Sequence, residues 1–262
     1  MQNPGNIESY LYQSVAKIDN NSLRSQSNQL LTNLYKKITT SLQPNVVLEI
    51  GARQADFSFA MSEVLPNTKF ICYEANKHSF NAFSGRFEGR DNVEYLNMAI
   101  SDYTGLTAIK IPVGDRPEVL IKGNASLLNR SNYSKGYIEE TVSCTTLDKS
   151  CLSISTDSTV CAWIDVEGHF RAVHQGGSAT FSRLDALYVE VEDHCYWEGQ
   201  ALTSEVYSMM NGSGMVAIAR DREYDLQHNV IFIREYLTER IKPMLDEFFE
   251  KLAILSNTSS HV

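Results

Sequence analysis

The stretch VVLEIGARQAD, residues 46–56, decides the fold of this chain. Its first five residues form an apolar run broken only by Glu49, which is typical of a strand buried on both faces of a parallel sheet. Gly51 and Ala52 follow directly, and small residues between a strand and a helix let a ligand approach the backbone closely. The same residues also suit a tight turn without a ligand. The stretch therefore predicts a strand, a turn and a helix, with a candidate ligand site at the turn.

Outward from this stretch, strand and helix patterns alternate along the chain. Such alternation predicts βαβ units on a mainly parallel sheet, and thus an α/β fold. We expect strands at 46–50, 69–73, 93–98, 107–112, 139–144, 161–166 and 184–191, an antiparallel pair at 215–220 and 230–234, and helices at 56–65, 79–87, 171–175, 202–210 and 235–255.

The chain divides into two expected parts. Residues 1–43 are polar, with leucines at helical spacing over 22–42, and suit a docking helix or a cover over a substrate site. Residues 44–262 form the α/β domain, with a polar, glycine-containing insert around 103–143. Long irregular segments of this kind are often functional.

Composition narrows the class of protein. The 262 residues are 43% hydrophobic with a net charge of −9, which fits a globular domain and disfavours nucleic acid as the main partner. No run approaches the roughly 20 apolar residues of a membrane span, and the N-terminus lacks a signal-peptide pattern. The five cysteines include no CxxC pair. We expect a cytoplasmic protein without a membrane partner. The sequence leaves the oligomeric state open and is compatible with a homodimer.

Glu74 ends the second expected strand, 25 residues after Glu49. In nucleotide-binding βαβ units an acid at this place accepts hydrogen bonds from the ribose hydroxyls. A dinucleotide site also needs the Gly-x-Gly-x-x-Gly pattern, but here Arg53 and Asp56 occupy the second and third glycine positions. An acid at that helix start repels a diphosphate, whereas a cationic sulfonium ligand suits it. The residues therefore favour S-adenosylmethionine over NAD, and disfavour an NAD-dependent oxidoreductase.

A series of short motifs runs from Val46 to Glu192. In chain order they are Glu49 to Ser58, Glu74-Ala75-Asn76, Ala99-Ile100-Ser101-Asp102 with Gly105, Ser126-Leu127, Thr146-Leu147-Asp148, Ile164-Asp165-Val166-Glu167-Gly168, Gly176 and Glu190-Val191-Glu192. Together they resemble the motifs of FkbM-type methyltransferases. That resemblance implies a class I, Rossmann-like fold: a mainly parallel seven-stranded sheet with a terminal antiparallel strand and helices on both faces.

The resemblance also implies a function and a set of cofactor-binding residues. It implies methyl transfer from S-adenosylmethionine to a hydroxyl of a small sugar-like or secondary-metabolite acceptor. The implied cofactor residues are Glu49, Gly51 and Ala52 at the methionine part, Glu74, Ala75 and Asn76 at the ribose, Ala99, Ile100 and Ser101 at the adenine, and Asp165 nearby.

Two residues depart from the family pattern. Ala55 replaces a glycine and Arg53 replaces an asparagine in the first motif. The added methyl group would lie where the amino-acid part of the cofactor approaches. The alternative function is therefore a non-catalytic cofactor-binding or scaffold domain that keeps the fold.

Candidate catalytic residues lie at the end of the strand expected at 161–166. His169, Asp165 and Glu167 lie there, at the sheet edge that faces the ligand crevice. His169 is the first candidate for the base that removes the acceptor proton, although it could instead cap the next helix. Asp165, Glu192 and Asp193 are candidate ligands of a divalent metal such as Mg²⁺, or simply solvated acids. Tyr196 and Trp197 are candidates for an acceptor wall.

Overall fold

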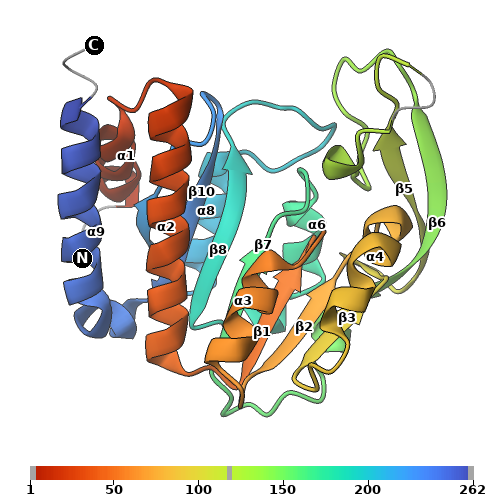
Figure 1. Ribbon diagram of the computed structural model, residues 1–262, viewed down its shortest axis with the longest axis horizontal. Helices are drawn as coiled ribbons and strands as arrows, with labels where there is room; N and C mark the ends of the chain where they lie inside the picture. The colour runs from red at the N-terminus through yellow and green to blue at the C-terminus, as the bar shows by residue number, and fades with distance from the viewer. Residues whose placement is uncertain (1–3, 117–119, 259–262) are drawn as a thin grey trace.

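The computed structural model describes residues 4–116 and 120–258. Residues 1–3 of the expected N-terminal segment, 117–119 of the insert and 259–262 lie outside this description. The centre is a seven-stranded sheet with the order β3-β2-β1-β7-β8-β10-β9 (Figure 1). Its strands are β1 (Val46–Ile50), β2 (Lys69–Tyr73), β3 (Val93–Leu96), β7 (Val160–Ile164), β8 (Ala186–Glu192), β9 (Met215–Arg220) and β10 (Gln227–Arg234).

The strand directions confirm the expected α/β, Rossmann-like fold. The strands from β3 to β8 pair in parallel, whereas β10 runs antiparallel to both β8 and β9. All five residues of β1 are buried, because β1 pairs with β2 on one edge and β7 on the other. Its apolar run reflects this central position.

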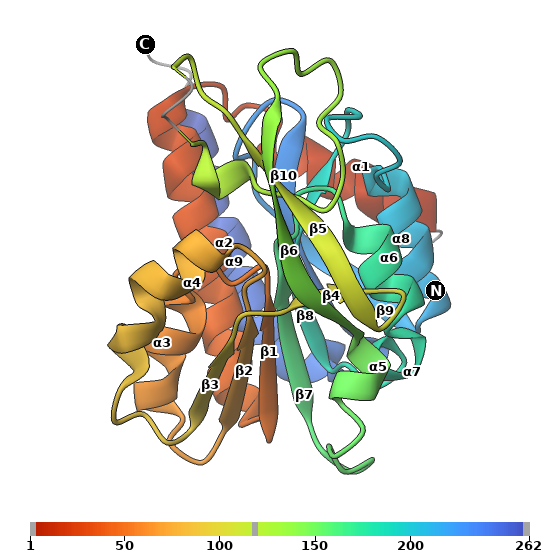
Figure 2. The same ribbon diagram turned by 90° about the vertical axis from the view of Figure 1, so that its right-hand side faces the viewer.

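Helices cover both faces of the sheet (Figure 2). One apolar core lies under the longer helices and includes Tyr35, Phe57 and Phe248, while a second core on the opposite face includes Phe170 and Met210. The helices are α1 (Pro4–Val15), α2 (Asn21–Leu42), α3 (Asp56–Val64), α4 (Lys77–Phe83), α5 (Leu147–Ser150), α6 (Phe170–Gln175), α7 (Ser178–Phe181), α8 (Thr203–Gly212) and α9 (Thr238–Thr258), with 3-10 turns η1 (Ser84–Phe87), η2 (Lys122–Asn124) and η3 (Glu235–Leu237). No helix in these described ranges is long and apolar enough to cross a membrane.

Helix α2 is anchored directly to the central sheet. The Tyr35 ring is fully buried, and its hydroxyl donates a hydrogen bond to the Ala162 carbonyl of β7 at 2.5 Å. Leu31, Leu34 and Ile38 are buried on the same side. This helix therefore supplies part of the domain core, beside α9.

The insert and the residues that flank it form a second sheet above the carboxyl ends of the central strands (Figure 2). It contains β4 (Ala99–Ser101), β5 (Gly105–Pro112) and β6 (Tyr137–Thr146) in the order β4-β6-β5. The sequence predicts the last two strands but not β4, which is only three residues long. The expected helix at 79–87 instead begins at Lys77, because the Asn76 side chain caps it, and its last turn is 3-10.

Candidate active site

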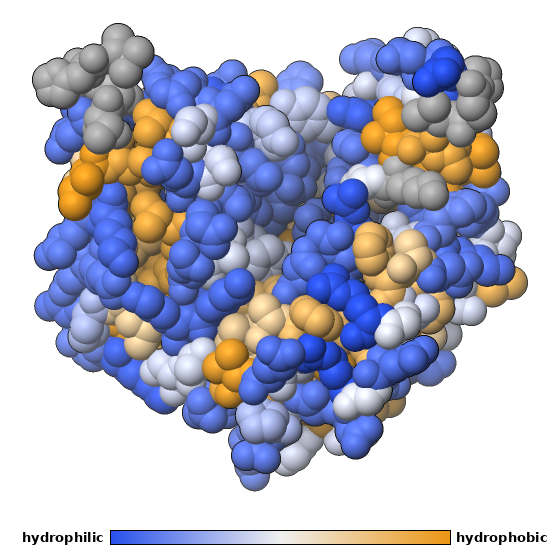
Figure 3. Space-filling view, in the orientation of Figure 1, coloured by the Kyte–Doolittle hydropathy of each residue, from blue (hydrophilic) through white to orange (hydrophobic). Residues whose placement is uncertain are grey.

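A cavity of about 550 Å³ opens at the carboxyl ends of β1, β2, β7 and β8. The space-filling view shows the upper edge of the molecule hollowed between the α2–α9 side and the second sheet, with a mostly hydrophilic surface (Figure 3). Open α/β sheets bind their ligands at this edge. The cavity therefore lies where the sequence predicts the site.

The turn after β1 forms one wall of the cavity. Gly51 has φ of +76°, and a Cβ atom there would lie 1.6 Å from the Asp165 carbonyl oxygen at the end of β7. Arg53 and Ala55 also adopt left-handed backbone conformations, with φ of 47° and 50°. The glycine is thus required by close packing of the neighbouring strand, in addition to any approach of a ligand.

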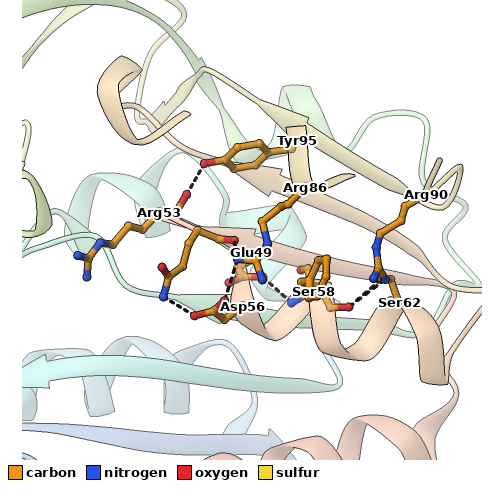
Figure 4. Close-up of polar contacts among 10 residues, drawn as sticks. Glu49, Arg53, Asp56, Ser58, Ser62, Arg86, Arg90 and Tyr95 are labelled. Carbon is orange, nitrogen blue, oxygen red and sulfur yellow. Dashed lines mark hydrogen bonds and ion pairs between the residues drawn. The ribbon is translucent and has the colours of Figure 1, made fainter. Parts of the chain in front are cut away.

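Side chains from η1 and β3 hold this turn in place (Figure 4). The Arg86 guanidinium donates hydrogen bonds to the Gln54 carbonyl at 2.6 Å and to the Asp56 carboxylate at 2.8 Å. The Tyr95 hydroxyl donates to the Arg53 carbonyl. The turn is therefore fixed before any ligand binds.

Glu74 follows β2 and presents its carboxylate at the cavity wall. The backbone N–H of Arg53 donates to Oε2 at 2.5 Å, and that of Asn76 donates to Oε1 at 2.6 Å. Burial raises the pKa of Glu74 to about 7, although both N–H donors lower it. Each carboxylate oxygen can accept a further hydrogen bond, so the pair fits two ribose hydroxyls.

Glu49 lies beneath the turn and does not line the cavity. Its buried carboxylate accepts a hydrogen bond from the Ser58 N–H of α3 at 2.8 Å (Figure 4). Burial raises the pKa of Glu49 to about 7. In this structure Glu49 therefore caps α3.

Ala55 also points away from the cavity. It is fully buried in a small apolar cluster with Ala52, Cys72 and Phe87. The extra methyl group therefore does not occupy space where a ligand would lie. Arg53, the other departure, lines the cavity, and its guanidinium lies close to Gly123 of the insert.

The structure brings together part of the expected cofactor set. Ala99 and Ile100 line the cavity beside Met98 and Ile109, which gives an apolar surface suited to an adenine ring. The predicted residues at the cavity wall are Gly51, Glu74, Ala75, Ala99, Ile100 and Asp165, whereas Glu49, Ala52, Asn76 and Ser101 lie outside the lining.

The three candidate catalytic residues, His169, Asp165 and Glu167, all line the cavity. His169 Nε2 lies 3.0 Å from the Ser101 hydroxyl, which in turn lies 3.0 Å from the Asp102 carboxylate. Burial lowers the pKa of His169 to about 4. Ser101 thus positions the imidazole ring.

Carboxylates also gather at the carboxyl ends of β7 and β8. Oxygen atoms of Asp165, Glu167 and Glu190 all lie within 4.8 Å of one another. Burial and mutual repulsion raise the pKa of both Glu167 and Glu190. Of the other expected metal ligands, Glu192 lines the cavity, but Asp193 lies outside it, 3.8 Å from His228 Nδ1.

The predicted acceptor wall residues, Tyr196 and Trp197, also line the cavity.

Further lining residues could not be predicted from the sequence, because loops far apart in the chain supply them. Backbone pairing between Arg130 and Trp197 joins the insert to the loop after β8. The missed residues include Arg130, Glu223, Tyr224 and Gln227. Period-2 alternation along β8 could have placed Glu190 on the same side as Glu192.

The strand order and the position of the cavity are those of class I, Rossmann-like methyltransferases. Residues 49–226 match the model of the methyltransferase FkbM domain, and the chain belongs to this family.

Individual relatives are distant. The chain is 22% identical over 178 residues to the 2-O-methyltransferase NoeI of Sinorhizobium fredii (strain NBRC 101917 / NGR234), covering 66% of this chain and 73% of NoeI. Among solved structures it is similar to a precorrin-6y C5,15-methyltransferase from Geobacter metallireducens GS-15, with a TM-score of 0.38 and 13% identity over 76% of this chain and 86% of that one. It is also similar to a ribosomal protein L11 methylase from Lactobacillus delbrueckii subsp. bulgaricus, with a TM-score of 0.43 and 9% identity over 80% and 79%.

Proposed function

We propose that this protein transfers a methyl group from S-adenosylmethionine to a hydroxyl of a small sugar-like or secondary-metabolite acceptor. The observation that carries the proposal is Glu74, whose buried carboxylate is held at the cavity wall by two backbone N–H groups. The FkbM family membership and the similarity to a 2-O-methyltransferase support the same reaction class.

The chain offers a partner for each part of the cofactor. Glu74 would accept the ribose hydroxyls, and Ala99 and Ile100 would contact the adenine. The Arg53 guanidinium at the cavity wall would pair with the methionine carboxylate. When bound, S-adenosylmethionine supplies an activated methyl group on a sulfonium, so the protein contributes mainly proximity and orientation.

The acceptor hydroxyl must lose its proton near the transition state. His169 is the candidate base because it lines the cavity and its ring is held by Ser101. When the Ser101 hydroxyl donates to Asp102, His169 Nε2–H donates to Ser101 and leaves Nδ1 as the proton acceptor.

The second candidate function is a non-catalytic domain of the same fold. Arg53 and Ala55 suggest it from the sequence, but the buried Ala55 methyl group leaves the cavity open. The structure thus removes the steric argument for this candidate, and we favour the enzyme.

Transfer of a labelled methyl group to a panel of monosaccharides and hydroxylated metabolites tests the proposal. His169→Ala should lower turnover by about 10²-fold or more with S-adenosylmethionine affinity unchanged. His174→Ala is the matched control, because His174 contacts Ser213 and does not line the cavity. Full activity of His169→Ala would remove His169 as the base. Cofactor binding without transfer to any acceptor would favour the non-catalytic domain.

A further inference from the structure

We call the part of the cavity wall formed by Asp165, Glu167 and Glu190 its acceptor end. This acidic group is assembled from two neighbouring strands. Asp165 and Glu167 follow β7, and Glu190 lies in β8, which pairs with β7 in parallel. Oxygens of the three carboxylates lie within 4.8 Å of one another. Ligand oxygens lie about 2.0 to 2.6 Å from Mg²⁺, Mn²⁺ or Ca²⁺, so two on opposite sides of one ion are about 4 to 5 Å apart. The spacing allows all three residues to contact one ion.

The carboxylates lack sufficient partners within the described chain. The Oε1 atom of Glu190 is buried at the cavity and has no hydrogen-bond partner among the described residues. A buried carboxylate oxygen without a donor or a cation is strongly unfavourable. The unpartnered oxygen gives the acidic cluster a free acceptor that a bound cation would satisfy.

The charge balance favours a divalent ion over an organic ammonium group. Glu192 and Glu223 also line the cavity and repel the charged form of Glu190, so five acidic residues lie near one another. In the described cavity lining, guanidinium groups come only from Arg53, beside Gly123, and Arg130, beside Trp197. A single ammonium would neutralise one charge, whereas a divalent ion neutralises two and takes hard oxygen ligands from several carboxylates at once.

We propose that Asp165, Glu167 and Glu190 bind one divalent cation, of the Mg²⁺ or Mn²⁺ class, at the acceptor end of the cavity. This ligand set differs from the one expected from sequence, because Glu167 and Glu190 take the places of Glu192 and Asp193. The ion's role rests on the proposed function: there it would coordinate and polarise the acceptor hydroxyl. Binding of the ion itself needs neither the cofactor nor an acceptor.

Mn²⁺ titration of the EDTA-treated, desalted protein tests the site, with free Mn²⁺ counted by electron paramagnetic resonance and heats by calorimetry. We expect one Mn²⁺ per chain, and Glu190→Gln should weaken binding by at least about tenfold. Asp193→Asn should change it by less than about twofold, since Asp193 lies outside the cavity lining. Thermal unfolding should show Glu190→Gln folded and at least as stable as the parent, because the amide removes one of several mutually repelling buried carboxyl groups.

Absence of Mn²⁺ binding by the parent would overturn the site, as would equal binding by a folded Glu190→Gln protein. A loss in Asp193→Asn as large as in Glu190→Gln would transfer the site to the set expected from sequence. S-adenosylmethionine binding, measured in the same preparations, separates the two proposals. If the protein binds S-adenosylmethionine but does not bind Mn²⁺, only the metal site is contradicted. If it binds Mn²⁺ but does not bind S-adenosylmethionine, only the methyltransferase proposal is contradicted.

Discussion

The two ends of the cavity differ in how their charged groups are satisfied. One end contains Glu74 and is called the cofactor end because we propose that it binds the cofactor. Both oxygens of Glu74 accept backbone hydrogen bonds there, from Arg53 and Asn76. At the acceptor end, Asp165, Glu167 and Glu190 face one another, and the Glu190 Oε1 atom has no partner in the described residues. Backbone donors preorganise one end, whereas we propose that a bound cation completes the other.

This contrast follows from the way each end is built. The turn after β1 and the turn after β2 lie side by side, so short-range backbone geometry completes the cofactor end. The acceptor end takes residues from the insert, from β8 and from the loop before β10. Substitution of Glu74, which is not one of the proposed metal ligands, should therefore alter cofactor binding and leave Mn²⁺ binding intact.

The largest effect should come from Gly51→Ala. The new Cβ would meet the Asp165 carbonyl oxygen in a left-handed conformation, so we expect the free energy of unfolding to fall by more than about 3 kcal/mol. Gly89→Ala is the matched control, since Gly89 has the same φ of +76° but no atom within 4 Å of its Cβ position. It should cost only about 1 kcal/mol. Equal losses in urea unfolding would contradict the close packing of β1 and β7.

Glu49→Gln should change the pH dependence of stability. Burial raises the pKa of Glu49 from 4.5 to about 7, so the folded state binds a proton more tightly than the unfolded chain. The tighter proton binding by Glu49 stabilises the folded state fully below pH 4.5, and this stabilisation is lost as the pH rises through about 7. Relative to the parent, Glu49→Gln should gain about 3 kcal/mol between pH 4 and pH 8. Urea unfolding at both pH values measures this, with surface Glu94→Gln as control; parallel curves would show that Glu49 stays charged.

Glu74→Ala should weaken S-adenosylmethionine binding by about 1 to 3 kcal/mol, because hydrogen bonds to a buried carboxylate are lost. Exposed Glu63→Ala should leave binding unchanged. In the parent, affinity should fall as the pH drops through about 7, where Glu74 gains a proton and loses acceptor capacity. A pH-independent Kd between 6 and 8 would argue against Glu74 as the ribose acceptor.

The smallest effect should come from Ala55→Gly. The substitution relieves a left-handed alanine but removes a buried methyl group, so stability should change by less than about 1 kcal/mol. The Kd for S-adenosylmethionine should stay within about threefold, because the methyl group does not line the cavity. A large gain in affinity would show that Ala55 does obstruct the cofactor.

Much of the fold could be predicted from sequence. The buried strand at 46–50, the closing antiparallel pair and helices on both faces are confirmed, because apolar runs and periodicity report burial directly. The strand β4 was missed since three residues carry no periodic signal, and its paired residues in β6 lie 45 positions further along the chain.

The site was predictable to a lesser degree. Residues at strand ends, such as Glu74, Asp165 and His169, line one cavity because parallel strands end at one edge, while their roles stay predictions. The orientation of Glu49 and Ala55 depends on the path of a turn with three left-handed residues, which the sequence pattern does not specify. The short distance between the carboxylates of Glu167 and Glu190 depends on the register of β7 against β8.

Calorimetric titration of the purified protein with S-adenosylmethionine and S-adenosylhomocysteine, with NAD as control, tests the central claim most directly. We predict micromolar binding of both adenosyl ligands, its weakening in Glu74→Ala, and no binding of NAD. Absence of binding by either adenosyl ligand up to about 1 mM would contradict the account.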